Sequence, residues 1–231
     1  FAQQTANKTD RVNWFQDLGF GMFIHWNVDV SLGSVISHSL AGASDEYVNK
    51  YIQELPSYFN PEQFNPKNWA KLAKLAGMKY VVFTAKHHAG FAMFQTKTTP
   101  FNVMNTPFKR DITKEIVEAF RAEGIAVGIY FSPDDFYYLH THKQPIGRAQ
   151  DPAHYPKTNP GLMEYDKAQL KELLTQYGKI DILFIDGPGD GLREFAWSIN
   201  PDLVITRDAM KTPEQTTPNA SLPRPWEDRK S

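Results

Sequence analysis

Residues 110–132 read RDITKEIVEAFRAEGIAVGIYFS, a segment in which an amphipathic helix is followed directly by an apolar strand. Four apolar residues lie on one face of the expected helix: Ile112, Ile116, Val117 and Phe120. Gly124 follows them and is typical of a helix end. The run from Ile125 to Ser132 is apolar on both faces, which is typical of a strand in a parallel sheet that helices cover.

The same alternation of strand and helix recurs along the chain. Further strands are expected at residues 21–26, 80–85, 180–185 and 203–206, and further helices at 65–76, 161–177 and 192–199. Long insertions follow the first and third strands, at residues 28–66 and 133–160. The pattern predicts one α/β domain over residues 1–231, and periodicity alone does not separate a (β/α) barrel from a doubly wound sheet.

Composition excludes several classes of protein. The 231 residues include 25 Lys and Arg against 26 Asp and Glu, so no basic excess indicates a nucleic-acid partner. The absence of Cys excludes a disulfide scaffold, thiolate metal sites and a Cys nucleophile. No apolar run reaches the roughly 20 residues of a membrane span. The sequence does not decide the compartment: we favour export, and the cytoplasm is the alternative.

Polar side chains end each of the five expected strands. They are His25; Lys86, His87 and His88; Tyr130 and Ser132; Asp186; and Arg207. Any one of them could satisfy a loop or cap a helix. Five successive strand ends with polar groups favour a single pocket, because the carboxyl ends of parallel strands form the site in α/β folds.

Asp186 lies between an apolar run and Gly187-Pro188-Gly189, a segment unsuited to helix capping. A carboxylate there needs neighbouring donors to stay ionised, and it suits either a nucleophile or a metal ligand. A glycosidase would need a second carboxyl group on the other side of the reacting bond. Glu214 and Glu227, both in the irregular segment after the fifth strand, are the candidates.

Several short motifs together resemble a known family. They are FIHW at residues 23–26, KHHAGF at 86–91, GIYFS at 128–132, Asp186-Gly187, and TPE at 212–214. In this order they are similar to the α-L-fucosidases of glycoside hydrolase family 29, and the resemblance runs from about Asn13 to Trp226.

The resemblance implies a retaining exo-glycosidase on a (β/α) barrel that needs no cofactor and acts on fucosylated oligosaccharides or glycoconjugates. Asp186 would be the nucleophile and Glu214, preferred to Glu227, the acid/base. The residues implied in fucose binding are His25, Glu46, Tyr47, His87, His88, Tyr130 and Arg207. Phe94 or Trp197 are candidates for contact with the C6 methyl group.

The chain also departs from the family pattern. Asn27 stands where the family usually has Gly, and Asp134-Asp135-Phe136 replaces a common Asp-Trp. Only five βα units are visible, whereas a complete barrel has eight. We therefore expect a shortened barrel without the family's C-terminal β-sandwich. Its edge strands would need cover, so self-association into a homo-oligomer is expected.

Two other functions remain open. A metal-dependent hydrolase is suggested by His87-His88 and by His140 and His142, although adjacent histidines on a strand should point to opposite sides and no motif such as HExxH is present. A non-catalytic sugar-binding relative is the other. Elemental analysis for metals and turnover of a chromogenic α-L-fucoside separate the three.

Overall fold

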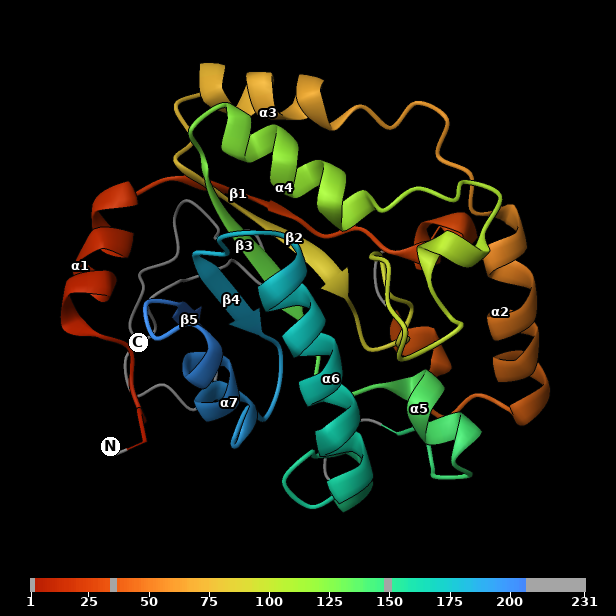
Figure 1. Ribbon diagram of the computed structural model, residues 1–231. Coiled ribbons are helices and arrows are strands. Elements are labelled where there is room, and N and C mark those ends of the chain that lie inside the picture. The colour runs from red at the N-terminus through yellow and green to blue at the C-terminus, as the bar shows by residue number, and fades with distance from the viewer. Residues whose placement is uncertain (1–2, 34–36, 148–150, 207–231) are drawn as a thin grey trace, which may run out of the picture.

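The computed structural model describes residues 3–33, 37–147 and 151–206 (Figure 1). Within them lies one parallel sheet of five strands: β1 (Gly21–Ile24), β2 (Tyr80–Lys86), β3 (Ala126–Phe131), β4 (Ile182–Ile185) and β5 (Val204–Thr206). All five strands expected from the apolar runs are confirmed, with ends that differ by at most two residues. The candidates Arg207, Glu214 and Glu227 lie outside the described residues.

The strand order distinguishes between the two α/β architectures that periodicity left open. The strands follow one another as β1-β2-β3-β4-β5, and each pair of neighbours is parallel. A doubly wound sheet reverses direction at a switch point, whereas the wall of a (β/α) barrel adds its strands in chain order. The fold is therefore that of a partial (β/α) barrel, as expected.

Helices alternate with the strands. The α-helices are α1 (Thr9–Leu18), α2 (Asp45–Tyr58), α3 (Pro66–Leu75), α4 (Ile112–Ala122), α5 (Phe136–Thr141), α6 (Pro160–Gln176) and α7 (Leu192–Ile199), and the 3₁₀ turns are η1 (Val28–Leu32), η2 (Ser37–Leu40), η3 (Val103–Asn105) and η4 (Pro152–His154). The starts have clear causes: Pro66 and Pro160 open α3 and α6, and Asp111 accepts a hydrogen bond from the Lys114 amide. None of these helices combines the length and apolar character needed to span a membrane.

The two long insertions contain helices that the periodicity did not indicate. Ser44 caps α2, and the helix continues through Pro56 into its last turn. Asp135 caps the six-residue α5. Both helices lie on the side of the molecule to which the strand arrows point, while α3 with α4 and α6 with α7 cover the sheet itself (Figure 1). The insertions thus build the walls around the carboxyl ends of the strands.

Alternate residues of each strand enter two separate cores. The larger core lies between the sheet and the covering helices and includes Val81, Phe83, Ile129 and Leu183. The smaller core lies on the opposite, inner face: Phe15, Val82, Tyr130, Ile182, Phe184 and Val204. Phe15 comes from α1 and meets Tyr80 edge-on at a centroid distance of 5.1 Å. Helix α1 therefore closes one end of the inner core, and the strand ends at the other side are left for a site.

The outer strand β5 is covered in part by the chain's own start. The Asn7 side-chain amide donates to the carbonyl of Ile205, and its oxygen accepts from the Ile205 amide, both at 2.8 Å. Arg11 adds a hydrogen bond to the carbonyl of Asp202 at 2.8 Å. Asn7 thus pairs with this edge as a neighbouring strand residue would, which meets part of the need for cover expected at the fifth strand.

Lys86 does not join the other polar strand-end residues, contrary to the expectation of one shared pocket. A register irregularity between Thr84 and Lys86 turns the Lys86 side chain toward the outer core. Its ammonium lies 3.0 Å from Asp135 Oδ2 and 2.8 Å from Asp166 Oδ1, and all three side chains are fully buried. The cluster joins the end of β2 to α5 and α6.

Asp166 is the residue of this cluster whose burial is least well compensated. Burial raises the pKa of Asp166 to about 8, against the opposing effect of Lys86. Its second oxygen, Oδ2, has no hydrogen-bond partner among the described protein atoms. Because a neutral carboxyl is less costly than a carboxylate in such a place, Asp166 is expected to carry a proton near neutral pH.

This protonation predicts a pH dependence of stability. Between about pH 4 and pH 8 the folded chain keeps a proton on Asp166 that the unfolded chain has lost, so the free energy of unfolding contributed by Asp166 falls as pH rises. Asp166→Asn does not titrate there. Urea unfolding at pH 5 and pH 8 should show the parent losing stability relative to Asp166→Asn at the higher pH. A difference between the two proteins that is independent of pH would contradict the assignment.

Candidate active site

Four of the predicted site residues meet at the carboxyl ends of neighbouring strands. His25 follows β1, His87 follows β2 and Tyr130 lies near the end of β3. The His25 ring meets the edge of His87 at a centroid distance of 4.7 Å and of Tyr130 at 5.4 Å, and His87 stacks on Tyr130 at 5.6 Å. His88 is next to His87, with ring centroids 4.4 Å apart. These side chains therefore lie together at the strand ends, as a single site would require, and their roles stay predictions.

Asp186 completes this group from the end of β4. The Tyr130 hydroxyl donates a hydrogen bond to Asp186 Oδ2, and His88 Nε2 lies 3.7 Å from the same oxygen. The Asp186 side chain is 16% exposed, so a ligand can reach it. Asp186 is thus a partly exposed carboxylate that accepts a hydrogen bond from Tyr130 and lies beside the His88 imidazole, a placement compatible with a nucleophile or a metal ligand.

His25 is the exposed member of this group. The residue is exposed, yet the protein atoms crowded around its ring lower the pKa of the imidazole, an effect that Asp186 opposes and His88 reinforces. Its Nδ1 lies 3.3 Å from Thr84 Oγ1, which itself donates to the carbonyl of Ile24 at 3.0 Å. His25 is thus favoured as a neutral ring that can exchange hydrogen bonds with a ligand.

The two adjacent histidines do not point to opposite sides, so that argument against a metal site is wrong. Strand β2 ends at Lys86 after its register irregularity, and alternation no longer governs the residues that follow. Ligand atoms of His87, His88 and Asp186 all lie within 4.8 Å of one another, close enough to be drawn onto one ion. His140 and His142 take no part, because they contact Asn49 and Tyr138 on α2 and α5.

The apolar floor of the pocket differs from the one expected. Phe94 and Trp197 are buried in the outer core, so neither can contact a sugar in the pocket. On the inner face, Phe184 stacks on Tyr130 at a centroid distance of 5.5 Å and meets Phe23 edge-on at 5.1 Å. Phe23 and Phe184 are the aromatic side chains beneath the polar group, and their alternation along β1 and β4 could have identified them.

Glu46 and Tyr47 are not brought into this group. Both are exposed at the start of α2, and Tyr47 lines a surface groove with Leu32, Tyr51 and Tyr58. Within the described part of the chain, no hydrogen bond, ion pair or ring contact joins either residue to the histidines, Tyr130 or Asp186. Their predicted role in fucose binding stays a prediction, as do those of Arg207 and Glu214.

Sequence reasoning missed the residues that stand behind the two histidines. Ser37 Oγ lies 2.8 Å from His87 Nδ1, and Ser132 Oγ contacts His88 Nδ1. Ser132 had been noted only as a polar strand end. Asp29 and Tyr51, which lie behind Ser37, are separated from it by 8 and 14 residues, and no periodicity connects them. No sequence signal could have found this arrangement.

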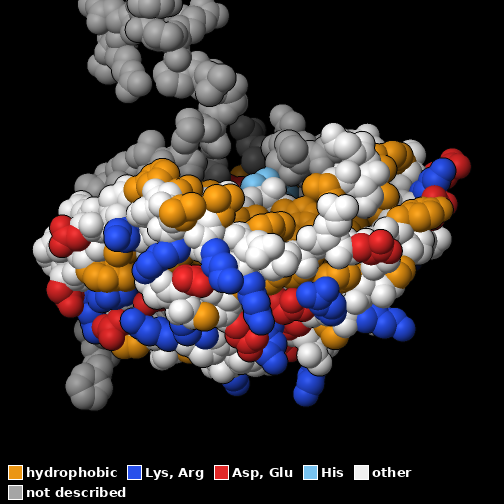
Figure 2. Space-filling model, turned by 90° about the horizontal axis from the view of Figure 1, so that it is seen from above, with side chains coloured by type: hydrophobic (Ala, Val, Ile, Leu, Met, Phe, Trp, Pro, Cys, Tyr) orange, Lys and Arg blue, Asp and Glu red, His pale blue; other side chains and the backbone are white. Residues whose placement is uncertain are grey.

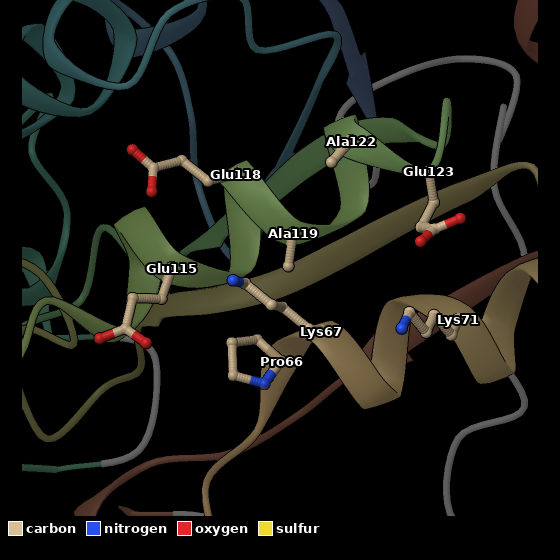
Figure 3. A pocket seen from close by; sticks show the side chains of 8 residues that line it. All are labelled: Pro66, Lys67, Lys71, Glu115, Glu118, Ala119, Ala122 and Glu123. Atoms are coloured by element: carbon tan, nitrogen blue, oxygen red, sulfur yellow. The ribbon is translucent and has the colours of Figure 1, made fainter.

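The surface view shows histidine side chains reaching the surface beside a group of hydrophobic side chains (Figure 2). Charged side chains of both signs are mixed over the covering helices below them. A separate groove runs between α3 and α4, with Lys67 and Lys71 on one wall and Glu115, Glu118 and Glu123 on the other (Figure 3). None of the strand-end residues lines that groove, which is a junction between two outer helices.

Comparison with known proteins identifies the family of the chain. Residues 2–231 match the profile of the family described as Alpha-L-fucosidase. The chain belongs to the α-L-fucosidase family. Alpha-L-fucosidase 1 of Arabidopsis thaliana is 31% identical over 168 residues, which cover 67% of this chain and 30% of that protein.

Solved structures of fucosidases share the fold. α-L-Fucosidase isoenzyme 1 from Paenibacillus thiaminolyticus superposes with a TM-score of 0.70 at 34% identity and covers 85% of this chain and 49% of its own. The GH29 α-L-fucosidase from Bacteroides thetaiotaomicron, trapped as a covalent intermediate with 2-fluoro-fucosyl fluoride, gives 0.69 at 29% identity, over 89% of this chain and 50% of its own. The chain thus spans half or less of the length of these fucosidases.

Proposed function

We propose that this chain hydrolyses terminal α-linked L-fucose from glycans by a retaining double displacement. The observation that carries the proposal is the position of Asp186, a reachable carboxylate at the end of β4 within contact of Tyr130 and His88. Membership of the fucosidase family supports fucose as the sugar.

In the proposed reaction, a carboxylate oxygen of Asp186 attacks the anomeric carbon as the bond to the leaving oxygen breaks, which forms a glycosyl ester. A second carboxyl group, proposed to be Glu214 with Glu227 as the alternative, gives its proton to the leaving oxygen. It then takes a proton from water, which attacks the ester and releases fucose and free Asp186. Retaining enzymes hold the two carboxyl groups about 5–5.5 Å apart.

The histidines and Tyr130 are proposed to bind the sugar hydroxyls. Fucose is neutral and rich in hydroxyl groups, so imidazole and phenol groups can serve it as donors and acceptors without a buried net charge. Phe23, which is partly exposed, lies beside this polar group on the inner face, where an apolar part of the sugar can pack, and the buried Phe184 supports Tyr130 and Phe23 from beneath.

Loss of one histidine should weaken fucose binding. His87→Ala or His88→Ala is expected to cost roughly 1–3 kcal/mol of binding free energy, the scale for a lost buried hydrogen-bond partner. Isothermal titration with L-fucose measures the effect. His142→Ala, a histidine that stacks on Tyr138 away from the pocket, is the matched control and should bind as the parent does.

A metal-dependent hydrolase is the second candidate, and the convergence of His87, His88 and Asp186 favours it. Elemental analysis of the purified chain and turnover of a chromogenic α-L-fucoside with and without a chelator separate the two. Activity that a chelator abolishes and zinc restores would overturn the sugar-binding role of the histidines. Fucose binding without turnover would indicate a non-catalytic relative.

We also propose that the chain self-associates. In the described part of the sheet no strand pairs with the outer edge of β1, while Asn7 serves the edge of β5. A second copy that covers the β1 edge should raise the mass measured by sedimentation at micromolar concentration above the 26.4 kDa of one chain. A fully active monomer would contradict this expectation.

A further inference from the structure

His87 rests on a short chain of buried polar groups that leads away from the pocket. Its Nδ1 lies 2.8 Å from Ser37 Oγ, and the same hydroxyl donates to Asp29 Oδ2 at 3.1 Å. Tyr51 donates to the other oxygen of Asp29 at 2.6 Å. Ser37 and Asp29 are fully buried, and His87 is 3% exposed. Solvent therefore has little influence on the positions of the protons in these hydrogen bonds.

The protons available on these four side chains fix the direction of each hydrogen bond between them. An ionised carboxylate can only accept, so both Ser37 and Tyr51 must donate to Asp29. Burial and the neighbouring carboxylate raise the pKa of Tyr51 well above its usual value, so Tyr51 keeps the proton that it donates. The Ser37 hydroxyl has a single proton, and once that proton points to Asp29 only a lone pair is left for His87.

We propose that Asp29, Tyr51 and Ser37 are positioning residues that hold neutral His87 with its proton on Nδ1 and leave Nε2 as an acceptor for a fucose hydroxyl. The acceptor role rests on the proposed function, whereas the position of the proton does not. Free imidazole can carry its proton on either nitrogen, and the partner of one nitrogen decides the role of the other. The site would then demand a hydroxyl donor at His87 and disfavour a ligand group that only accepts.

The opposite assignment is costly in this geometry. If Ser37 donated to His87, no proton would lie between Ser37 Oγ and Asp29 Oδ2, and two lone pairs would face each other in a buried place. The same arrangement recurs at His88, where Ser132 donates to the carbonyl of Asp134 at 2.9 Å and must accept from His88 Nδ1. The two serines therefore act alike on neighbouring imidazoles.

The test is a long-range ¹H–¹⁵N correlation spectrum of the full chain with ¹⁵N-labelled histidine, recorded near pH 8. The chain has seven histidines, and the signals of His87 are assigned by their loss in His87→Gln. In the parent, Nδ1 of His87 should show the shift of a protonated nitrogen and Nε2 that of an unprotonated one. A parent spectrum with the proton on Nε2 would overturn the proposal.

Asp29→Asn is the decisive variant because the Asn side chain has the shape of Asp but reverses the direction of the hydrogen bonds from residue 29 to His87. An Asn amide can accept from Tyr51 and donate to Ser37, which turns the Ser37 proton toward His87 and moves the imidazole proton to Nε2. Ser37→Ala should leave His87 in a mixture of both forms. Ser39→Ala, at an exposed serine of the same turn, is the matched control and should keep the parent spectrum. An unchanged His87 in Asp29→Asn would also overturn the proposal.

Measurement of fucose binding distinguishes the positioning role of Asp29, Tyr51 and Ser37 from the proposed function. L-Fucose affinity should fall roughly tenfold in Asp29→Asn and Ser37→Ala but not in Ser39→Ala. If the proton moves as described and the parent neither binds nor hydrolyses fucosides, the proposed function fails while the position of the proton stands. If the parent hydrolyses fucosides and the proton of His87 is on Nε2, the positioning role fails and the proposed function stands.

Discussion

Asp186→Asn is expected to lower the turnover of an aryl α-L-fucoside by roughly 10⁴-fold or more, the scale seen when a covalent enzyme loses its nucleophile. An amide has the shape of the carboxylate but is a far weaker nucleophile, and it cannot stabilise the positive charge that develops on the sugar ring. The hydrogen bond from Tyr130 can persist, because the Asn oxygen still accepts it. The fold should therefore survive, as circular dichroism and the urea midpoint can show.

Asp190→Asn is the matched control for this loss. Asp190 lies four residues further along the same loop, is half-exposed and pairs with Arg193 and Lys157, outside the pocket. Its variant should keep most of the activity. A 2-fluorinated fucosyl fluoride should label Asp186 in the parent and leave the Asp186→Asn variant unlabelled, as peptide mass spectrometry can determine. Labelling of another residue, or turnover in Asp186→Asn close to that of the parent, would remove Asp186 from this role.

Lys86→Met is expected to have the largest effect on stability, a loss of about 3–5 kcal/mol in the free energy of unfolding. Removal of the ammonium leaves the Asp135 carboxylate buried without its cation and Asp166 without its hydrogen-bond donor, and the fully buried site admits no water to replace it. Met fills nearly the same volume, so the loss reports the charge and not a cavity. Urea unfolding followed by fluorescence measures it.

Lys79→Met provides the control, because this exposed lysine directly precedes β2 and a change there should stay within about 0.5 kcal/mol. Adding Asp135→Asn to Lys86→Met should recover part of the loss, since Asn can still cap α5 while the buried charge is gone. A Lys86→Met variant as stable as the parent would show that the three groups do not depend on one another.

Much of the barrel wall could be predicted, because burial on both faces leaves a mark in the sequence. The run IDILFID predicts β4 with Asp186 at its end, and α7 has the bounds that its apolar spacing indicated. The strands are apolar because helices cover one face and α1 helps to close the other. What decides between barrel and doubly wound sheet is the spatial order of the strands, which no local pattern contains.

The site could be predicted only where it follows the strand ends. Five predicted residues at the strand ends lie in contact with one another: His25, His87, His88, Tyr130 and Asp186. Lys86 also ends a strand, yet a register irregularity that has no sequence signature turns it into the outer core. Helix α2 was missed because residues 28–66 were taken only as an insertion; the helix includes Pro56, and a proline near the end of a helix removes only one backbone donor. Ser37 and Asp29 were missed because their roles depend on contacts across the fold.

The hydrogen bonds between Asn7 and Ile205 have a consequence for how the chain is made. They join residues 198 positions apart, so the amino-terminal segment cannot dock until β5 has left the ribosome. At roughly 5–20 residues per second, synthesis of that stretch takes about 10–40 s. Until then the inner core around Phe15 would lack the side that Val204 of β5 forms. Helix α1 is therefore expected to be among the last elements to pack fully, and a chaperone that binds nascent chains would find Trp14, Phe15 and Leu18 exposed on one face of it.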